Sequence, residues 1–164
     1  MNRRFVDVIG TSIDAISWDD VLARIASWAD KHESRYVCIC NSHSVVTANK
    51  DAEFARVLAL ADMVTPDGAP VAWMIRRLTS SDQQRINGPD LMWRYCAQAS
   101  SRDESIYLLG GTAETLTLLE QRLISAFPTL KIAGAESPPF RAISSNEDEA
   151  VIARINSSGA GTVW

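Results

Sequence analysis

The sequence predicts an α/β fold, a Rossmann-like and mostly parallel sheet flanked by helices, and three observations support this prediction. Short apolar runs alternate with longer segments whose apolar residues recur at helical spacing, which is typical of consecutive strand–helix units. Polar or glycine residues directly follow several of the apolar runs, at Asn41, Asp67 and Gly110. The 164 residues suffice for one domain with a substantial core. We therefore expect a single domain over residues 1–164.

The first predicted helix begins at Ser17, because a serine followed three residues later by Asp20 resembles a capping box with aspartate in place of the usual glutamate. Its apolar residues fall on one helical face: Val21, Leu22, Ile25, Trp28 and Ala29. The apolar run 36–40 is then a buried strand that ends at Asn41.

Two helices are expected between this strand and the next one. The first is short and carries Val45, Val46 and Ala48, and the second spans residues 51–60. The apolar side of the second helix is predicted to hold Phe54, Val57, Leu58 and Ala61.

A brief strand over residues 63–65 is stopped by Pro66-Asp67-Gly68. Residues 69–78 have the pattern of a helix with a proline in its first turn, and 79–84 form a polar loop. Pro89 opens the next helix, whose apolar residues are Leu91, Met92, Tyr95 and Cys96.

The second half begins with the clearest strand, residues 105–109, followed by Gly110-Gly111-Thr112 and a helix through Phe127. A strand over 130–133 and a helix over 145–157, capped by Ser145 with Asp148 at its third position, come next. Residues 162–164 begin another strand. Because most strands run about five residues or more, we expect the domain to be incomplete at its C-terminus.

Composition narrows the function classes. The net charge of −4 gives no basic field for nucleic acid, and no window approaches the ~18 apolar residues of a membrane-spanning helix. Residues 1–7 lack the apolar stretch of a signal peptide. Cys38 and Cys40 lie on one strand face, where a core or site-wall role is favoured over a metal pair, and we expect a reducing, cytoplasmic location.

The residues alone leave two interpretations for each candidate site group. Asp67 is a general base or an ordinary turn aspartate, and Arg85 is a diphosphate clamp or a surface arginine. Asn41 is a substrate contact or a helix cap. Gly110-Gly111-Thr112 is a phosphate cradle or a tight strand-to-helix turn.

Four motifs, in order, resemble the WecG/TagA/CpsF glycosyltransferases (glycosyltransferase family 26). They are Asn-x-His at Asn41, Ala-Asp-x-Val-x-Pro-Asp-Gly-x-Pro-Val-x-Trp ending at Trp73, Arg-x-x-Gly-x-Asp-Leu from Arg85, and Leu-Leu-Gly-Gly ending at Gly111. The resemblance covers about Asp7 to Trp164. Ile39 stands where the family often has a threonine, so a hydroxyl contact made there is lost. The family's Gly-x-Pro-x-Gln-Glu segment and C-terminal appendage have no counterpart here.

The resemblance implies an inverting glycosyltransferase that moves a sugar from a UDP-sugar donor to a polyprenyl-diphosphate-linked saccharide in surface polysaccharide biosynthesis. It assigns Asp67 as general base, and Asn41, Arg85 and the segment Gly110, Gly111 and Thr112 as substrate-binding residues. No Asp-x-Asp motif is present, so we expect no metal and no cofactor. The lipid acceptor implies that the complete enzyme works peripherally on the inner face of the cell membrane.

Two alternatives differ from this hypothesis. The chain is a truncated, non-catalytic relative, or it is a nucleotide-binding module without transfer activity. The tryptophans at helical spacing (Trp18, Trp28, Trp73 and Trp93) are expected in the core or at an interface. An incomplete sheet edge also favours a homo-oligomer. The sequence does not define the donor sugar or the acceptor saccharide.

Overall fold

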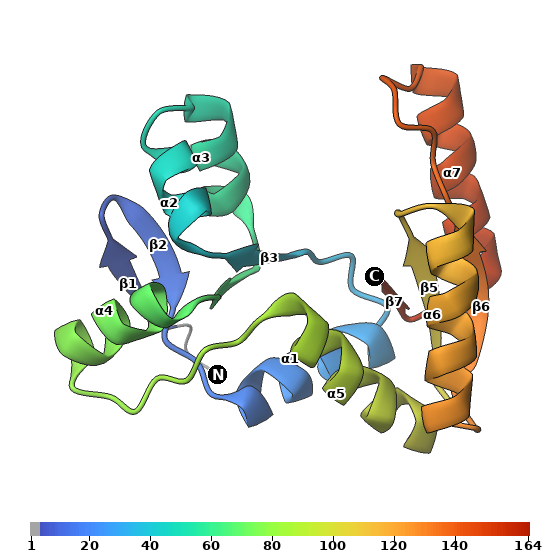
Figure 1. Cartoon of the computed structure of the whole chain (residues 1–164), viewed down its shortest axis with the longest axis horizontal. Helices are drawn as coiled ribbons and strands as arrows, with labels where there is room; N and C mark the ends of the chain where they lie inside the picture. Colours follow the sequence, from blue (N-terminus) through green and yellow to red (C-terminus); the bar gives the residue numbers. More distant parts are fainter. Residues whose placement is uncertain (1–3) are drawn as a thin grey trace. The chain divides into compact units, whose positions relative to one another are not determined.

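The computed structural model describes residues 4–164, in which the chain divides after Leu91 into two compact units. Unit 1 runs through Leu91 and unit 2 covers Met92–Trp164 (Figure 1). Met1, Asn2 and Arg3, part of the stretch expected to lack a signal peptide, lie outside the described residues. The single domain stays a prediction.

Unit 1 contains an antiparallel hairpin, a pair of parallel strands and the helices around them. Its elements are β1 (Phe5–Val8), β2 (Thr11–Asp14), α1 (Trp18–Asp30), β3 (Val37–Cys40), α2 (Ser42–Ala48), α3 (Ala52–Leu60), β4 (Met63–Pro66), α4 (Ala69–Thr79) and the start of α5 (Gly88–Ser101). The predicted positions of the helices and strands of this half are confirmed, but the strand predicted as buried, β3, is only partly so, since Cys40 alone is buried in it. The β1–β2 hairpin was not predicted and is an addition to the βα pattern.

The parallel strands β3 and β4 are held in register at both ends. Cys40 pairs with Pro66 at their carboxyl ends, where the Asp67 N–H also donates to the Cys40 carbonyl over 2.9 Å. At the other end the Asp62 carboxylate accepts the Tyr36 N–H. The buried Asp14 carboxylate, at the end of β2, accepts the Val64 N–H over 2.7 Å and so ties the hairpin to β4.

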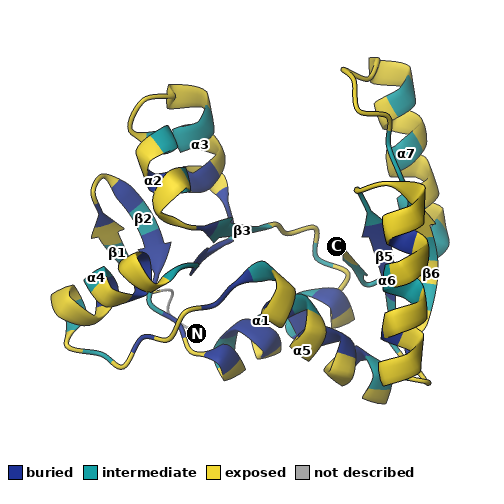
Figure 2. Ribbon diagram, in the orientation of Figure 1, coloured by how far each residue is buried: buried dark blue, intermediate teal, exposed yellow. Residues whose placement is uncertain are grey.

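The core of unit 1 joins its helices to these strands. Buried apolar side chains come from β1, β2, β3 and β4 and from α2, α3 and α4 (Figure 2): Val8, Ile13, Cys40, Val45, Leu58, Ala61, Val64, Val71 and Ile75. Since helices α2, α3 and α4 contribute to one cluster with the strands, the carboxyl ends of β3 and β4 have a fixed support.

Unit 2 is a three-stranded parallel sheet in the order β6-β5-β7 with helices packed on it. Its elements are the rest of α5, β5 (Ser105–Leu109), α6 (Ala113–Ala126), β6 (Lys131–Glu136), α7 (Ser145–Ser158) and β7 (Thr162–Val163). Helices α6 and α7 both contact β6. The parallel strands and flanking helices of the two units confirm the Rossmann-like α/β class.

Some local predictions need correction. Val57, expected on the apolar side of α3, is 49% exposed, whereas Leu58 and Ala61, expected on the same side, are buried. The cap of α7 is Ser144 and not Ser145, with Glu147 completing the capping box. Trp18 is buried, whereas Trp73 is 58% exposed. No helix within residues 4–164 is long and apolar enough to cross a membrane.

Candidate active site

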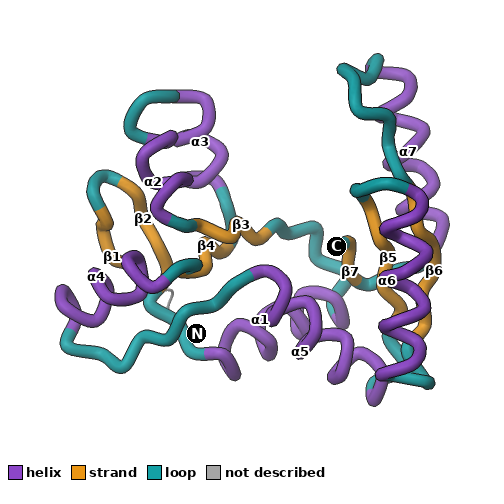
Figure 3. The backbone as a smooth tube through the Cα atoms, in the orientation of Figure 1, coloured by secondary structure: helices purple, strands orange, loops and turns teal. Residues whose placement is uncertain are grey.

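Three predicted site residues of unit 1 come together at the carboxyl ends of β3 and β4. Asn41 and Asp67 each follow the last residue of their strand, and Cys40 and Pro66, those last residues, are paired. Parallel strands bring such residues to one edge of the sheet, the usual ligand-binding edge of open α/β folds. Arg85 reaches this edge from the loop between α4 and α5, drawn in teal in Figure 3.

Asp67 presents a partly buried carboxylate in the turn between β4 and α4. Its Oδ1 lies 4.0 Å from Nε of Arg85, and 24% of its side chain is exposed. Within the described residues the carboxylate accepts no hydrogen bond from its own turn. The ordinary turn aspartate, which bonds its own backbone, is therefore not what this structure contains.

Gly68 allows the chain to turn from β4 into α4. Its φ of 84° lies in the left-handed half of conformational space, which a glycine adopts without penalty. A Cβ at this position would lie 3.9 Å from Cβ of Asn41, so the turn brings the Asp67 backbone beside Asn41. Because the helix cap is a glycine, no side chain covers the first N–H groups of α4.

Arg85 is positioned by the residue that follows it. The Ile86 N–H donates to the Pro66 carbonyl over 2.8 Å, and the buried Thr65 hydroxyl donates to the Ile86 carbonyl. The loop is thus bound to β4 one residue after Arg85. The Arg85 side chain is 54% exposed, and within residues 4–164 its ion-pair partner is the Asp67 carboxylate, which leaves guanidinium donors available to an anion.

The same loop is also bound through Gln83, a residue of the segment 79–84 that was predicted to be a polar loop. This side chain is 5% exposed. Its amide accepts the Ile16 N–H and donates to the Ile16 carbonyl and to the Gln84 carbonyl, each over 2.8 Å. A glutamine between polar residues carries no sequence signal for burial, so only the structure reveals it.

Asn41 caps α2, one of its two predicted roles. Its Oδ1 accepts the Ser44 N–H over 3.0 Å, and the Ser44 hydroxyl completes a capping box. The residue is exposed, and its Nδ2 has no hydrogen-bond partner within the described chain. The cap fixes the side chain and leaves one amide donor, so the substrate-contact role stays compatible with it.

A second asparagine, Asn87, caps α5, a role that was not predicted from the sequence. Its Oδ1 accepts the Asp90 N–H over 2.8 Å and its Nδ2 donates to the Asp90 carboxylate. Asn at a helix start with Asp three residues later is a capping signature that the sequence does contain. A Cβ on Gly88 would lie 3.8 Å from Cγ1 of Ile39, so the residue at the position where the family often has a threonine lies beside the start of α5.

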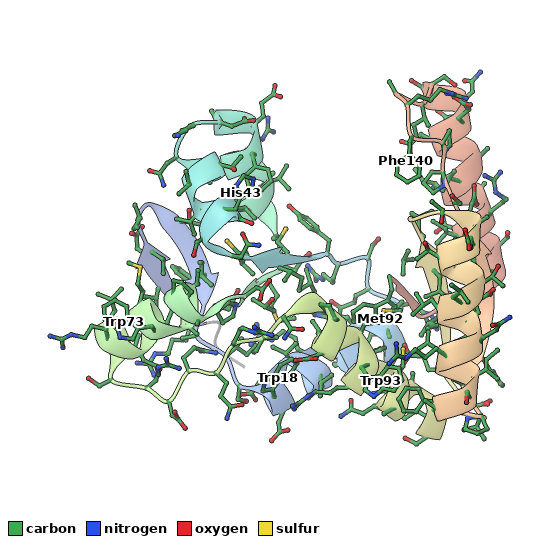
Figure 4. The ribbon with its side chains drawn as sticks, viewed as in Figure 1. Trp18, His43, Trp73, Met92, Trp93 and Phe140 are labelled. Atoms are coloured by element: carbon green, nitrogen blue, oxygen red, sulfur yellow. The ribbon has the colours of Figure 1, made fainter. Side chains whose placement is uncertain are left out.

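The thiols near this edge are structural. Cys40 is fully buried and Cys38 packs against the same core, as predicted. Burial raises the pKa of the Cys40 thiol to about 11, and the nearby Cys38 and Asp67 add to the shift. The thiol is therefore protonated at neutral pH. His43, labelled in Figure 4, is an exposed residue of α2.

In unit 2, Gly110, Gly111 and Thr112 connect β5 to α6 at the carboxyl end of the sheet. Both glycines have positive φ, 121° and 72°, and Thr112 caps α6 by accepting the Thr115 N–H over 3.1 Å. The Gly110 N–H donates to the Glu136 carbonyl at the end of β6. The N–H groups of Gly111 and Thr112 have no acceptor among residues 4–164. The predicted tight turn is present, and its free N–H groups are those that a phosphate cradle requires.

A charged group lies next to this turn. The Glu136 carboxylate accepts a hydrogen bond from the Tyr107 hydroxyl and two from the Arg154 guanidinium. The Arg154 hydrogen bonds lower the pKa of Glu136, so the carboxylate is ionised at neutral pH. Across the part of the chain that is described, no group of three or more His, Cys, Asp or Glu side chains could hold a metal ion.

The fold and these residues define a class: a Rossmann-like α/β protein with an Asp–Arg pair at the carboxyl ends of parallel strands. The chain belongs to the WecG/TagA/CpsF family of glycosyl transferases, whose family model matches residues 6–164. The resemblance predicted from the four motifs is confirmed.

One curated relative is the N-acetylglucosaminyldiphosphoundecaprenol N-acetyl-beta-D-mannosaminyltransferase of Bacillus subtilis (strain 168). The two sequences are 26% identical over 122 residues, which cover 70% of this chain and 48% of the relative. The matched segment thus spans about half the length of that relative.

Proposed function

We propose that this chain is a glycosyltransferase, or the corresponding part of one, that moves a sugar from a UDP-sugar to a polyprenyl-diphosphate-linked saccharide. Family membership supports the reaction class. The relative's name supports the acceptor, since it specifies an undecaprenol-linked diphosphate sugar. The observation that carries the proposal is the Asp67 carboxylate, partly buried at the carboxyl end of β4 with the Arg85 guanidinium 4.0 Å away.

In the proposed reaction Asp67 is the general base. Its carboxylate takes the proton of the acceptor hydroxyl as that oxygen forms a bond to the anomeric carbon of the donor sugar. The bond between the anomeric carbon and the diphosphate oxygen breaks on the opposite side, so the configuration inverts. UDP leaves with the bonding electron pair, and the proton stays on Asp67 until it passes to solvent.

Arg85, Asn41 and the turn after β5 are proposed to bind polar and charged groups of the substrates. The exposed guanidinium of Arg85 can hold two phosphate oxygens at once and offset the charge of a diphosphate. Asn41 offers its Nδ2 as a donor to a substrate hydroxyl or phosphate. Within unit 2, the N–H groups of Gly111 and Thr112, just before α6, are proposed to bind phosphate.

The lipid-linked acceptor places this reaction at a membrane surface, so we propose a cytoplasmic protein that acts peripherally on the inner face of the cell membrane. Surface polysaccharide biosynthesis, of which exopolysaccharide synthesis is one example, is the pathway class that uses such acceptors.

The test measures UDP release from UDP-glucose, UDP-N-acetylmannosamine and its uronic acid, with a short-chain polyprenyl-diphosphate sugar as acceptor. We expect acceptor-dependent release with one donor, reduced at least about 100-fold by Asp67→Asn, the usual scale for a general base. Asp62→Asn is the matched control, since Asp62 is an aspartate at the other end of β4. UDP binding by the chain without any release would favour the nucleotide-binding module instead.

A further inference from the structure

The exposed face of α4 carries a tryptophan and two arginines that the proposed reaction does not use. Trp73, labelled in Figure 4, is 58% exposed although it ends the motif that contains Asp67. Arg76 and Arg77 follow it three and four residues later, at the spacing that places side chains on one face of a helix. Both arginines are exposed, and Figure 2 shows this part of α4 in yellow. We call these three residues the α4 face.

The α4 face is unusual in composition. Helix α4 contains no acidic residue, so its two arginines give it a local charge of +2 in a chain of net charge −4. One nitrogen of Arg76 donates to the Gln83 carbonyl over 2.9 Å, and Arg77 has no ion-pair partner within residues 4–164. Cations near the C-terminal end of a helix interact favourably with its dipole, and this effect is enough to account for the two arginines. It does not account for the exposed indole of Trp73 on the same face.

Trp with arginine is the combination that suits the boundary of an anionic membrane. An indole buries its ring near the lipid head groups while its N–H stays hydrated. Arginine beside such a surface is attracted to anionic head groups, by an amount equivalent to about fivefold in affinity for each residue. The charge of the α4 face is therefore complementary to an anionic lipid surface.

The position of α4 relates this surface to the candidate site. The helix begins at Ala69, two residues after Asp67, and Trp73 lies just over one helical turn further along. A membrane contact at the α4 face would hold the carboxyl end of β4 close to the lipid surface. We propose that the α4 face binds anionic lipid membranes and so presents Asp67 to a lipid-linked acceptor. The second half of this inference rests on the proposed function.

The test is sedimentation of the full chain with vesicles of phosphatidylglycerol and phosphatidylcholine, and with vesicles of phosphatidylcholine alone. We expect binding to the anionic vesicles that weakens from 0.05 to 0.5 M salt, because screening shortens the range of the attraction. Trp73→Gln and Arg77→Gln should each weaken this binding about fivefold or more. Glutamine keeps the helical preference of the segment.

Two matched variants serve as controls. Phe140→Gln removes an aromatic side chain that is even more exposed, at 84%, and Arg56→Gln removes an exposed arginine of α3. Neither change should alter vesicle binding. Equal binding to neutral vesicles, no binding to anionic ones, or unchanged binding by the Trp73 and Arg77 variants would each overturn the proposal. So would a Trp73→Gln variant that loses only self-association, measured by analytical ultracentrifugation.

Turnover on a short-chain acceptor in solution separates this inference from the proposed function. The Trp73 and Arg77 variants should retain that turnover, whereas Asp67→Asn should lose it. Vesicle binding by a chain without any turnover would contradict the proposed reaction and leave the lipid contact in place. Turnover by a chain that binds no anionic vesicles would contradict the lipid contact and leave the proposed reaction in place.

Discussion

The side-chain amide of Gln83 makes a hydrogen bond to each backbone polar group of Ile16. Its oxygen accepts the Ile16 N–H, and its nitrogen donates to the Ile16 carbonyl. The two residues are 67 positions apart, and Ile16 lies between β2 and α1. Gln83 precedes Arg85 by two residues, and the next backbone anchor of the loop is Ile86. Arg85 is thus held between two fixed points.

Replacing Gln83 should weaken the contribution of Arg85 to turnover. Gln83→Leu removes three hydrogen bonds and leaves the Ile16 backbone groups without partners, so we expect the free energy of unfolding to fall by about 2–4 kcal/mol. Turnover per folded molecule should fall as well. Urea unfolding and UDP release, measured on the same samples, check both effects.

A double-mutant cycle with Arg85→Ala identifies the cause. If Gln83 acts through Arg85, then Gln83→Leu should reduce turnover strongly in the parent chain and little in the Arg85→Ala chain. Equal effects in the two backgrounds would mean that Gln83 supports the fold without positioning Arg85.

Gly68→Ala should damage the site more than the fold. The φ of 84° and ψ of 145° at this position are strained for any residue with a Cβ, at a cost of about 1–3 kcal/mol. Relief of that strain would rotate the Asp67 turn, so UDP release should fall in addition. Gly159→Ala is the control, because its φ of 71° is also positive while no atom lies within 4 Å of the added Cβ. It should lose stability and keep turnover.

Gly134→Ala should destabilise unit 2 through a steric clash. A Cβ there would lie 2.5 Å from the ring of Tyr107, and the hydroxyl of that ring is held by Glu136. Overpacking of this kind costs about 1–3 kcal/mol. Gly88→Ala is the contrasting variant, with its Cβ at an ordinary 3.8 Å from Ile39. Thermal unfolding that is equal for the two variants would contradict the clash.

Alkali should destabilise the chain through its buried thiols. Burial raises the pKa of Cys40 and of Cys96 from the usual 9.0 to about 11. Above pH 9 the unfolded chain releases these protons while the folded chain keeps them. The contribution of the two thiols to the free energy of unfolding is therefore fully present below pH 9 and is lost as pH rises through about 11. Urea unfolding at pH 8, 9, 10 and 11 measures this loss.

A variant without these two thiols tests the assignment. The Cys40→Ala and Cys96→Ala double variant should be less stable at pH 8, because it creates cavities, yet show a flatter decline up to pH 11. A decline as steep as that of the parent chain would assign the alkali sensitivity to other groups.

Much of the fold could be predicted from the sequence because its strands and helices follow simple apolar patterns. The strand that ends at Cys40 and the helix that begins after Ser17 are examples. The β1–β2 hairpin was missed, since its strands have four residues each and its turn at Ile9-Gly10 does not match a common hairpin pair. The cap of α7 was misplaced because Ser144 and Ser145 are adjacent and either one fits the pattern.

The residues of the candidate site could be named from the sequence, but the contacts that hold them in place could not. Asn41, Asp67 and Arg85 stand at motif positions, and parallel pairing of β3 and β4 brings the first two to one edge. The supports are long-range contacts such as Gln83 with Ile16, which no local pattern encodes. Phosphate binding by the Gly110–Thr112 turn stays a prediction, because free N–H groups permit such binding without requiring it.

The pairing of Cys40 with Pro66 limits how the length of this chain can change over evolution. Successive residues of a strand point to opposite faces, so losing one residue from β4 would turn the Asp67 side chain to the other side of the sheet. An extra residue in the surface turn between α2 and α3 would shift neither strand end. Descendants of this sequence are thus free to drift in length at that turn, whereas insertions and deletions within β3 and β4 would be eliminated.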